Sequence, residues 1–529
     1  MSNTIPESVI PECRPIPNPI AGLDGRTFDV VVIGGGINGT AAAQHLAAEG
    51  YSVLLVEKND FGSGTSSRSS RLLHVGLAGL APASSPWEYL FKPGKFKAAL
   101  KSAREQSLSR TEFAGTSPER VQKFTFYFPI FDNSPYRGWQ IDVAFAILKR
   151  FNKGGPPLDY QRLNARQART APLLAQMRDS HRLVGGASFR EYQFDWAERV
   201  VVDSAMEARR LGATVRNYTA MEGYTRKGDG WELTLSDRLD GAAPAIKVGA
   251  KLVMNFAGVW VDQVNRMSNV HKARRLTTGA KGVHIMVRLA PELQDKGIFT
   301  EDANKEHFYL VPWRGLHYIG PTDTVFKGNL DDINPTEEDI ELMLDLTRRM
   351  MPGLPLKRSD VVYSWAGVRP RTYDPTVPKG TWSREIHDLT DDGMPNFLAL
   401  TGATIMRSRL TGRDAVTAVR KRIEPSGSPQ KLSFAAHLPP SNDPSPLLSN
   451  EGPAVRVSDI RHAIEAEQAC SLDDILFRRT GLGWGENMAR EYATAVAKIL
   501  GEYTDWTPER VDSEVRAYFD LVQRRNSAA

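Results

Sequence analysis

The feature that most constrains this chain is a glycine-rich turn that directly follows an apolar segment near its start. Residues 28–33 are a run of Phe, Val and Ile with one Asp, which is typical of a buried strand. Gly34, Gly36 and Gly39 then occupy the glycine positions of a G-x-G-x-x-G motif. In such a turn the first glycine allows a tight bend and the second lets backbone N–H groups approach a pyrophosphate. The third lets a helix pack closely on the strand.

The residues after this turn complete a strand–helix–strand unit. Small residues over 40–49 predict a closely packed helix, and residues 53–56 predict a second buried strand that ends at Glu57. The N-terminus of the helix offers free N–H donors to phosphate groups, and Glu57 can accept hydrogen bonds from ribose hydroxyls. A glycine motif alone would be weak evidence. Both strands, the helix and an acid about 20 residues on together predict a dinucleotide site.

Size and composition limit the class of protein. A chain of 529 residues is expected to form two or three core-forming units. Hydrophobic residues at 41% and charged residues at 24% are typical of a soluble globular protein. The net charge of +5 favours an anionic substrate or an anionic membrane surface. Because the basic residues are scattered among nearly as many acids, we expect no nucleic-acid partner.

The cysteines and the N-terminal residues indicate the cellular compartment in which the protein is expected. Cys13 and Cys470 are far apart, which predicts no disulfide framework, metal site or dithiol centre and fits a reducing compartment such as the cytoplasm. No stretch approaches the roughly 18 apolar residues of a membrane span. Residues 1–19 are rich in Pro and polar residues and lack the pattern of a signal peptide, so we expect a flexible arm.

A second motif indicates which dinucleotide is bound. Residues 62–74 are rich in Gly, Ser and Thr, where a nicotinamide dehydrogenase would normally continue with further alternating strands and helices. Their hydroxyl and N–H groups suit phosphate oxygens and the edge of a flavin, and the alternative is a solvated serine-rich loop. Residues 195–215 and 251–260 then predict a return to the nucleotide domain. Strands at 307–311 and 317–320 suit a substrate-side sheet.

The C-terminal part of the chain changes character. Residues 422–453 are rich in Pro and Ser and lose periodicity, which predicts a linker. Helical patterns over 458–523 predict a small helical domain. The predicted division is a flexible arm (1–27), an FAD-binding domain (28–90, 180–265 and 360–425) interleaved with a substrate domain (91–179 and 266–359), a linker (426–453) and a helical domain (454–529).

These segments together resemble FAD-dependent glycerol-3-phosphate dehydrogenase, within the D-amino-acid-oxidase-like flavoprotein superfamily. The resemblance implies an α/β fold with an interrupted Rossmann-like FAD-binding domain, an antiparallel substrate-side sheet and a C-terminal helical domain. The motifs that carry it are residues 32–39, 65–74, 281–284, 311–313, 319–323, 365–370 and 474–483.

Two departures from the family pattern concern the substrate. Where the pattern reads His-Gly-Gly-Leu-Arg-Tyr, this chain has Ala78 and Gly79 in place of the Arg and Tyr. That Arg resembles a ligand of the substrate phosphate. Where the pattern reads Gly-Gly-Lys-Leu-Thr-Thr, Ala403 replaces the Lys beside the flavin. The identity of the substrate therefore stays open. Three other cations are available to compensate for the missing Arg and Lys: Arg371, Arg407 and Arg409.

Four residues are candidates for the chemistry. The resemblance makes His284 our first choice for the base that takes the hydroxyl proton, and His74 is expected to orient flavin or substrate. Arg369 and Arg384 match the family's anion-binding positions, because a guanidinium binds phosphate or carboxylate oxygens in pairs. The plainer alternatives are structural histidines and surface ion pairs.

Further residues are expected around these four. Thr322 and Asp323 are candidates for a polar wall of the substrate site, with a turn as the alternative. The residues expected to bind the cofactor are Gly34, Gly36, Asn38, Gly39, Glu57, Lys58, Thr65, Ser66, Ser67, Arg71, Leu72, His74, Val201, Ala257, Gly258, Trp260, Gly402, Thr404 and Ile405.

The resemblance implies an FAD-dependent oxidation of a small anionic polyol, most simply sn-glycerol 3-phosphate to dihydroxyacetone phosphate. Hydride would pass to flavin N5, and electrons would pass on to quinone or another acceptor. The alternatives are another polyol phosphate, a 2-hydroxy acid or an amine as substrate, and a non-catalytic FAD-binding subunit. The sequence leaves open the oligomeric state and whether FAD is covalently attached.

Aromatic residues interleaved with lysines suggest contact with a membrane. They lie over residues 87–97, 124–131 and 139–151. Such a pattern suits a segment on an anionic leaflet, to which a protein that reduces quinone would bind peripherally. A buried aromatic core with a solvated lysine face fits the pattern equally well.

Overall fold

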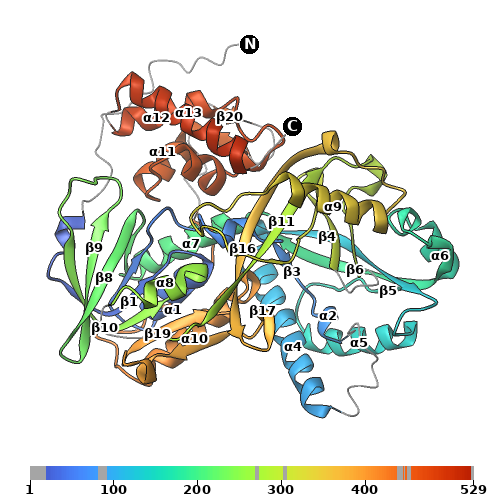
Figure 1. The fold of residues 1–529 in the computed structure, drawn as a ribbon, viewed down its shortest axis with the longest axis horizontal. Coiled ribbons are helices and arrows are strands. Elements are labelled where there is room, and N and C mark those ends of the chain that lie inside the picture. Colours follow the sequence, from blue (N-terminus) through green and yellow to red (C-terminus); the bar gives the residue numbers. More distant parts are fainter. Residues whose placement is uncertain are drawn as a thin grey trace.

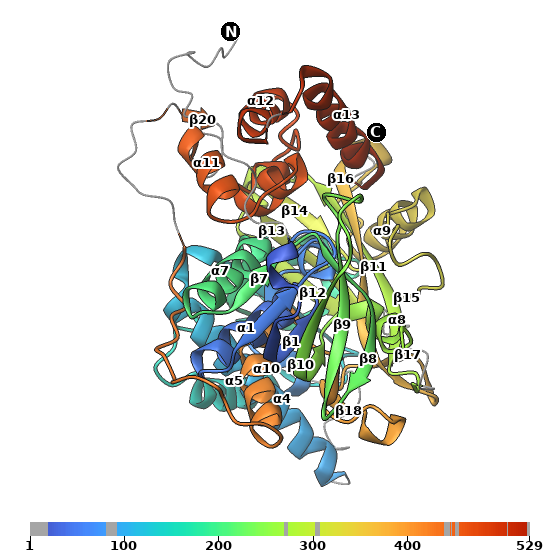
Figure 2. The same ribbon diagram turned by 90° about the vertical axis from the view of Figure 1, so that its left-hand side faces the viewer.

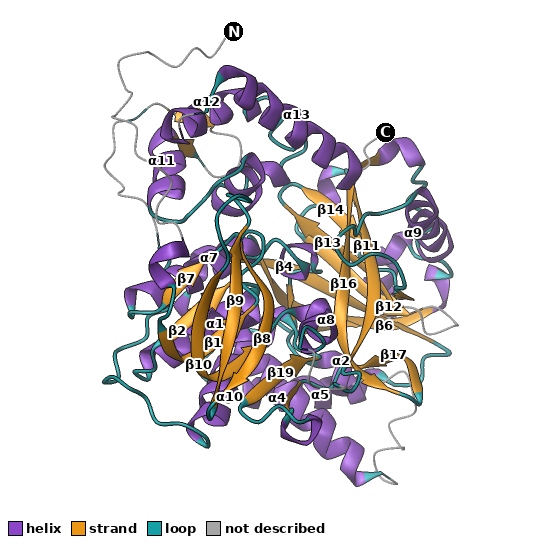
Figure 3. Ribbon diagram, turned by 60° about the vertical axis from the view of Figure 1, so that its left-hand side comes forward, coloured by secondary structure: helices purple, strands orange, loops and turns teal. Residues whose placement is uncertain are grey.

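The protein is described here from a computed structural model. It describes residues 20–80, 92–268, 273–301, 307–437, 445, 447–449, 454–504 and 506–525. Two β-sheets lie side by side, and a group of helices from the C-terminal part lies above both of them (Figures 1 and 3).

The first sheet is built around the apolar strand that opens the nucleotide motif. Strand β1 pairs in parallel with β2 on one side and β10 on the other. The central residues Val30, Val31 and Val32 have no exposed surface, as expected for a strand covered on both faces. The order along the sheet is β18 (Glu385–Asp388), β19 (Phe397–Thr401), β10 (Ile246–Asn255), β1 (Thr27–Ile33), β2 (Val53–Val56) and β7 (Thr214–Arg216).

Different elements cover the two faces of this sheet. Three helices pack on one face: α1 (Ile37–Ala48), α7 (Ala197–Arg210) and α10 (Ser408–Arg420). The other face is covered by the hairpin of β8 (Thr219–Lys227) and β9 (Gly230–Asp237), which Figure 2 shows in front of β1 and β10. The carboxyl ends of β1 and β2 therefore meet the glycine turn at one edge of a three-layered body.

The second sheet is larger and mostly antiparallel. Its order is β17 (Val377–Thr381), β16 (Val361–Asp374), β11 (Thr277–Val287), β14 (Leu316–Ile319), β13 (His307–Trp313), β12 (Lys296–Glu301), β4 (Val121–Phe131), β6 (Leu183–Phe194) and β3 (Leu72–Leu73). Two short strands pair at its sides, β15 (Thr324–Val325) on β11 and β5 (Gln161–Asn164) on β6.

Helices flank the second sheet. One group includes α2 (Leu77–Leu80), α4 (Pro93–Thr116) and α5 (Gly138–Phe151), and a second group includes α6 (Ala165–Thr170) and α9 (Glu337–Met350). Helix α9 has a capping box at Thr336 and Asp339, with acids in its first turn and arginines in its last, which is the charge order that its dipole favours.

The C-terminal helices form the predicted helical domain. It contains α11 (Val457–Glu465), the π-helix η12 (Asp474–Arg479), the short 3₁₀ helix η13 (Leu482–Trp484), α12 (Ala493–Thr504) and α13 (Pro508–Arg525). Its aromatic residues Phe477 and Trp484 join one hydrophobic core with Trp313, Tyr363 and Trp365 of the second sheet. The helical domain is thus packed directly on that sheet.

Several expected boundaries need correction. Residues 1–19 lie outside the described residues. Residues 20–27, which we assigned to the flexible arm, contain the short helix η2 (Ile20–Leu23), which packs beside β10 because Ile20 and Leu23 are apolar and buried. Strands β6 and β16 start in segments assigned to the FAD-binding part, but both belong to the second sheet because their partners are β4 and β11.

The predicted linker is attached to the first sheet over its described part. Gly427 N donates to Gly50 O (2.8 Å), and Gln430 N donates to Ala48 O (2.7 Å). Ser433 N donates to the carboxylate of Glu207 in α7 (2.7 Å). Residues 422–437 therefore follow the helical face as an extended strap before the chain reaches the helical domain.

The aromatic segments divide between the core and the surface. Residues 87–91 lie outside the described residues. Phe124, Phe126 and Phe128 of β4 belong to the core, so the membrane interpretation is wrong for that strand. On α5, Trp139 and Val143 are more than half exposed. None of the described helices is long and apolar enough to cross a bilayer.

Candidate functional site

The glycine turn has the close contacts that require glycine. A Cβ on Gly39 would lie 1.9 Å from Gly34 O, and a Cβ on Gly34 would lie 2.6 Å from Phe256 O. Gly34 also has a φ of 109°, in the region that favours glycine. The turn therefore holds α1 directly against the ends of β1 and β10, as the motif predicted.

The start of α1 presents polar groups that lack protein partners. Its N-cap residue Gly36 has no side chain to cap the helix. Ile37 N donates to Ser66 Oγ (3.0 Å), which brings the serine loop to the helix end. Asn38 Oδ1 and Thr404 Oγ1 are buried and have no hydrogen-bond partner among the described residues. Such unsatisfied buried atoms at a helix N-terminus fit a polar ligand such as a pyrophosphate.

Glu57 lies beside the glycine turn, at the end of β2. Its Oε2 accepts from Gly35 N (2.7 Å) and its Oε1 accepts from Asn59 N (2.9 Å). Burial raises the pKa of this carboxyl group, while the N–H groups of Asn59 and Gly35 oppose that shift. Each oxygen keeps a further acceptor position, so the residue fits the predicted role toward two ribose hydroxyls.

The segment after β10 borders the same region. A Cβ on Gly258 would meet no atom within 4 Å, so a ligand can approach the backbone here. The ring of Trp260 lies under the Lys58 ammonium, 4.5 Å from it, and both residues contact Asp331. Lys58 and Trp260 thus close one side of the region, although their polar groups are already paired with Asp331.

Three of the residues predicted to bind the cofactor are buried and make their contacts within the protein. Val201 is fully buried and packs under Gly62, so it has no surface to offer a cofactor, and that prediction is wrong. Leu72 is a core residue of β3. Arg71 is also fully buried and donates to both carboxylate oxygens of Glu198, at 3.0 and 2.8 Å. Its charge is used inside the protein, so its predicted contact with the cofactor is also wrong.

The serine loop is fixed largely by its own side chains. Thr65 Oγ1 donates to Val368 O of β16 (2.7 Å), and Ser67 Oγ donates to Gly64 O (2.9 Å). The Arg71 guanidinium lies between the rings of Trp313 and Trp484, 4.2 and 4.7 Å away. The loop therefore has a defined shape, with its hydroxyl groups engaged in holding it.

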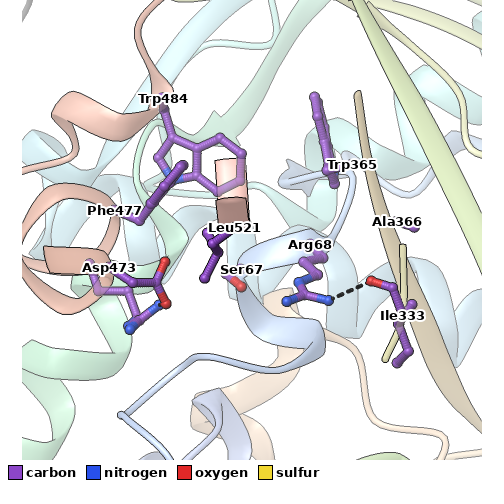
Figure 4. Close-up of a pocket in the computed structure, with 10 residues that line it drawn as sticks. Ser67, Arg68, Ile333, Trp365, Ala366, Asp473, Phe477, Trp484 and Leu521 are labelled. Carbon is purple, nitrogen blue, oxygen red and sulfur yellow. Dashed lines mark hydrogen bonds and ion pairs between the residues drawn. The ribbon is translucent and has the colours of Figure 1, made fainter. Parts of the chain in front are cut away.

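Behind this loop lies a small cavity of about 30 Å³ against the helical domain. Figure 4 shows Phe477 and Trp484 of that domain on one side and Arg68 and Trp365 on the other, with Arg68 donating to Ile333 O (3.1 Å). The indole N–H groups of Trp365 and Trp484 have no hydrogen-bond partner within the part of the chain that the structure describes. The volume suits ordered water rather than a substrate.

His284 lies on β11 in an inaccessible position. Its Nε2 is 3.0 Å from Ser70 Oγ, and its ring stacks on Trp365 at 4.8 Å and 11°. The residue is only 2% exposed, and burial together with the charges of Arg369 and Arg71 holds its pKa well below the usual range. The imidazole is therefore neutral, as a base must be, but its nitrogens are covered.

His74 differs from His284 in accessibility. A third of its side chain is exposed, although the ring lies deep enough that burial, with the charges of His307 and Arg407, lowers its pKa to about 4. Part of the ring is therefore open to solvent even though its surroundings disfavour the charged form. The ring centre of Tyr309 lies 6.0 Å from that of His74, and the charge of Arg369 acts on the Tyr309 phenol, opposing the rise in its pKa that burial causes.

Glu191 was missed in the sequence, although it belongs to this group of residues. It lies on β6, is 1% exposed and approaches His74 Nδ1 to 4.0 Å. The available signal was a carboxylate within a strand whose neighbours are mostly buried, at Ser188, Phe189 and Gln193. Without the strand pairing, that carboxylate cannot be placed beside His74.

The anion-binding candidates on β16 form a cluster around one carboxylate. Asp323 Oδ1 accepts from Arg369 Nη1 (3.0 Å) and from Arg371 Nη2 (2.8 Å), and Oδ2 lies 3.3 Å from Lys379 Nζ. The Nε of Arg371 is buried, and no described residue accepts a hydrogen bond from it. The ring of Trp382 covers the Arg371 guanidinium at 4.2 Å. Three cationic side chains thus face the single carboxylate of Asp323, and the Nε donor of Arg371 remains available for a hydrogen bond.

The other predicted side chains are engaged elsewhere. Thr322 Oγ1 accepts from Val283 N (2.9 Å), which fixes the turn rather than opening it to a ligand. Arg384 pairs with Asp414 of α10 and does not join Arg369 in the described contacts. Arg409 lies between two phenylalanine rings and donates to Ser117 Oγ (2.8 Å), so it has a structural role. Arg407 is close enough to influence His74 electrostatically.

The region bounded by the glycine turn, the serine loop and the end of β10 fits FAD. It offers a helix N-terminus, an acid for the ribose and buried unsatisfied oxygens. Gly402, with a φ of 67°, and Ile405 lie on either side of Thr404, between β19 and α10. The N–H group of Gly402 donates to Pro370 O (2.7 Å) and that of Ala257 donates to Asn255 Oδ1 (3.1 Å), so these two donors are already used within the protein.

Comparison with known proteins matches this geometry. The FAD dependent oxidoreductase family (DAO) matches residues 29–409, and the C-terminal domain of alpha-glycerophosphate oxidase matches residues 441–511. The chain is 27% identical over 562 residues to a glycerol-3-phosphate dehydrogenase of Synechocystis, covering 95% of this chain and 97% of that protein. It is 30% identical over 558 residues to glycerol-3-phosphate dehydrogenase 2 of Mycobacterium tuberculosis, covering 95% and 89%.

A solved structure has the same fold. The glycerol-3-phosphate dehydrogenase of Bacillus halodurans, determined as a complex with FAD, superposes with a TM-score of 0.70 at 21% identity, over 95% of this chain and 96% of that one. The predicted fold class is therefore confirmed.

Proposed function

The chain belongs to the FAD dependent oxidoreductase family, and on that premise we propose that it oxidises the secondary hydroxyl of a small anionic polyol. The simplest such substrate is sn-glycerol 3-phosphate, with dihydroxyacetone phosphate as product. Relatives that align with nearly the whole chain carry the name glycerol-3-phosphate dehydrogenase. FAD is the cofactor, as predicted, and when bound it supplies the acceptor for a hydride.

The observation that carries the proposal is the cation cluster around Asp323. Arg369 and Arg371 are largely buried, at 18% and 8% side-chain exposure, while Asp323 is more open at 37%. With Lys379 the cluster has three positive charges and one negative charge. An entering phosphate would meet an excess of charge-assisted donors, which favours an anionic substrate over a neutral polyol.

His74 is better placed than His284 to take the hydroxyl proton. A base must come within hydrogen-bond reach of the proton it removes. His74 has accessible surface, whereas His284 is covered by Trp365 and bonded to Ser70. The proton would leave the hydroxyl oxygen for the imidazole, and the electron pair left on oxygen would form the C=O bond. His284 would then hold Ser70 and the sheet in position.

The two alanine positions keep a second substrate class open. Ala403 stands where the family pattern has a lysine, and the site has cations at Arg371 and Lys379 instead. A substrate bound by these cations could differ from glycerol 3-phosphate in the distance between its reacting carbon and its anionic group. Another polyol phosphate or a 2-hydroxy acid is therefore the alternative substrate.

A substrate panel tests these assignments. The holoenzyme is mixed anaerobically with each candidate, and the visible absorbance of the bound flavin is followed. Rapid bleaching by glycerol 3-phosphate, with none by glycerol, supports the first assignment. Bleaching only by another anionic alcohol moves the protein to the second. No bleaching by any alcohol or amine would leave an FAD-binding protein without this activity.

The electron acceptor is a second part of the proposal. Electrons from the enzyme would reach a membrane quinone if the protein binds peripherally to the membrane from the cytoplasm. Trp139 and Val143 on α5 are exposed, and Lys149 and Arg150 follow on the same helix, an arrangement that favours an anionic leaflet. Sedimentation with anionic vesicles should be reduced in a Trp139→Ser, Val143→Ser variant. Equal sedimentation of both proteins would contradict this surface.

A further inference from the structure

Glu191 is a buried carboxylate that the proposed reaction leaves unused. It lies on β6 opposite Phe124 of β4, in the interior of the second sheet. Its exposure is 1%. A carboxylate is costly to bury unless its oxygens are bonded or paired, so its neighbours indicate why it is there.

The first group of neighbours is the segment that carries His74. Glu191 Oε2 accepts from Val75 N at 3.0 Å, and the same oxygen is 4.0 Å from His74 Nδ1. One oxygen therefore faces both the backbone after His74 and its ring. The hydrogen bond to Val75 N fixes the backbone that carries the ring, while at 4.0 Å the carboxylate acts on the imidazole by charge and not through a hydrogen bond.

The second neighbour holds the carboxylate from the other side. Arg110 of α4 has no exposed surface, and its Nε lies 3.6 Å from Glu191 Oε1. Arg110 is itself fixed, because it donates to Asn152 Oδ1 and to Arg190 O, both at 3.1 Å. The carboxylate therefore has a rigid support that does not depend on His74.

Burial brings the pKa of Glu191 close to neutral pH, and charged groups from several elements face the pair. Burial raises the pKa of Glu191 to about 7, against the opposing effects of Arg110 and the N–H groups of Val75 and Tyr192. His74 is faced by His307 from β13 and Arg407 from η11 (Ile405–Arg407). The phenol of Tyr309 lies near both groups, and burial raises its pKa above its usual range.

We propose that Glu191 is the positioning residue of His74: its carboxyl group keeps Nδ1 turned toward β6 and leaves Nε2 as the proton acceptor for the substrate hydroxyl. This inference rests on the proposed oxidation. A carboxylate behind an imidazole fixes its tautomer and stabilises the imidazolium that forms when the proton arrives. The proton moves from the substrate oxygen to Nε2, while the proton on Nδ1 stays directed at Glu191.

The test compares flavin reduction in two matched variants of the holoenzyme. Glu191→Gln keeps the size and an acceptor for Val75 N but removes the charge. We expect single-turnover reduction to slow by about 10- to 100-fold, with less than about a threefold change in substrate affinity. The control is Glu341→Gln, because Glu341 makes an exposed ion pair with Arg348 on α9, a helix that carries none of the proposed catalytic groups. It should reduce at the wild-type rate.

A double variant shows whether the effect passes through His74. In a His74→Ala background, Glu191→Gln should cause little further loss, because residues that act as a unit are not additive. An unchanged rate in Glu191→Gln, or the same additional loss without His74, would overturn the proposal.

A measurement on the unaltered protein covers the case in which Glu191→Gln does not fold. In holoenzyme labelled with ¹⁵N-histidine, the His74 signals are identified by their loss in His74→Ala. At pH 7.5 we expect the neutral ring with its proton on Nδ1, and a proton on Nε2 would overturn the proposal. This measurement needs no substrate, so it stays decisive if the substrate assignment fails.

Discussion

Two groups of charges in this molecule contain similar residues but have opposite characters. Asp60 lies at 1% exposure between the first sheet and the helical domain. Its oxygens accept from Arg478 Nε (2.6 Å), from Arg479 Nη1 and Nη2 (both 2.8 Å) and from Asn217 Nδ2 (2.8 Å). Asp323 is 37% exposed and faces three cations, Arg369, Arg371 and Lys379.

The Asp60 group has the features of a structural ion-pair cluster, whereas the Asp323 group has the features of a binding site. The Asp60 group is closed, because every acceptor position is used by the protein and water is excluded. The Asp323 group is open, because its donors outnumber its acceptors and solvent can reach it. Among the described residues an arginine Nε lacks a hydrogen-bond partner in both groups, at Arg371 and at Arg479, so it is solvent access that marks the Asp323 group as the place where a ligand would complete the bonding. Substitutions in the two groups should therefore affect different properties.

The largest effect is expected for Arg479→Met, which leaves Asp60 with too few partners. Removing one member of a buried ion pair costs about 3–5 kcal/mol of folding free energy. Urea unfolding of the variant and the parent would measure the loss. The control is Arg510→Met, because Arg510 is half exposed and its pair with Glu514 should contribute less than about 1 kcal/mol. Similar losses of unfolding free energy in both variants would contradict a structural role for the Asp60 cluster.

The same group predicts how acid affects stability. Burial alone would raise the pKa of Asp60, but Arg479 and Arg478 outweigh it and hold the pKa at about 2, below the ordinary value of 3.8. The folded protein therefore binds this proton more weakly than the unfolded chain does. The contribution of Asp60 is present above about pH 4 and is lost as the pH falls toward 2. In Arg479→Met this part of the acid dependence should shrink, and an unchanged pH dependence would contradict the assignment.

In the open group, Arg369→Ala should have the largest effect on the substrate. Hydrogen bonds from a charged donor contribute about 1.5–3 kcal/mol, so the KM for an anionic substrate should rise about 10- to 100-fold. Folding should change little, because Asp323 keeps Arg371 and Lys379. The matched control is Arg420→Ala, because Arg420 at the end of α10 makes an exposed ion pair with Glu49, which follows α1. A normal KM in Arg369→Ala would remove the cluster from the substrate site.

These two groups also show what the sequence could and could not reveal. The glycine turn, Glu57 and the serine loop were predictable because their chemistry depends on residues close together in the chain. Asp60 and Arg479 are 419 positions apart, and Arg71 meets Glu198 over 127 positions. Only the packing of whole domains brings such charges together. Arg71 was for that reason assigned to the cofactor, although its charge is consumed by Glu198.

The same limit explains the two histidines. His284 and His74 both match family positions, and the motif alone favoured His284. Accessibility separates them, and it depends on Trp365 lying opposite His284 in the β11–β16 register. Glu191 was missed because its partner Val75 joins it through the fold of β3 against β6.

A smaller effect is expected for Asp323→Asn. The change removes the one negative charge that competes with an anion for the three cations. Inorganic phosphate, used as a competitive inhibitor, should bind about fivefold more tightly, since a screened charge pair near the surface contributes on the order of 1 kcal/mol. Weaker phosphate binding would show that Asp323 orients the arginines for the anion instead of occupying its place.

The smallest effect is expected for Lys379→Ala. Lys379 is half exposed, and its ammonium is 3.3 Å from Asp323 Oδ2, so solvent screens its charge more than that of Arg369. We expect the KM for the anionic substrate to rise only about two- to threefold at low salt and to approach the parent value near 0.5 M salt. Arg369→Ala should keep its defect at both salt concentrations, because its guanidinium is mostly buried. If both variants lost their defects equally in salt, the cluster would act as a diffuse positive surface and not as a site with one buried and one exposed side.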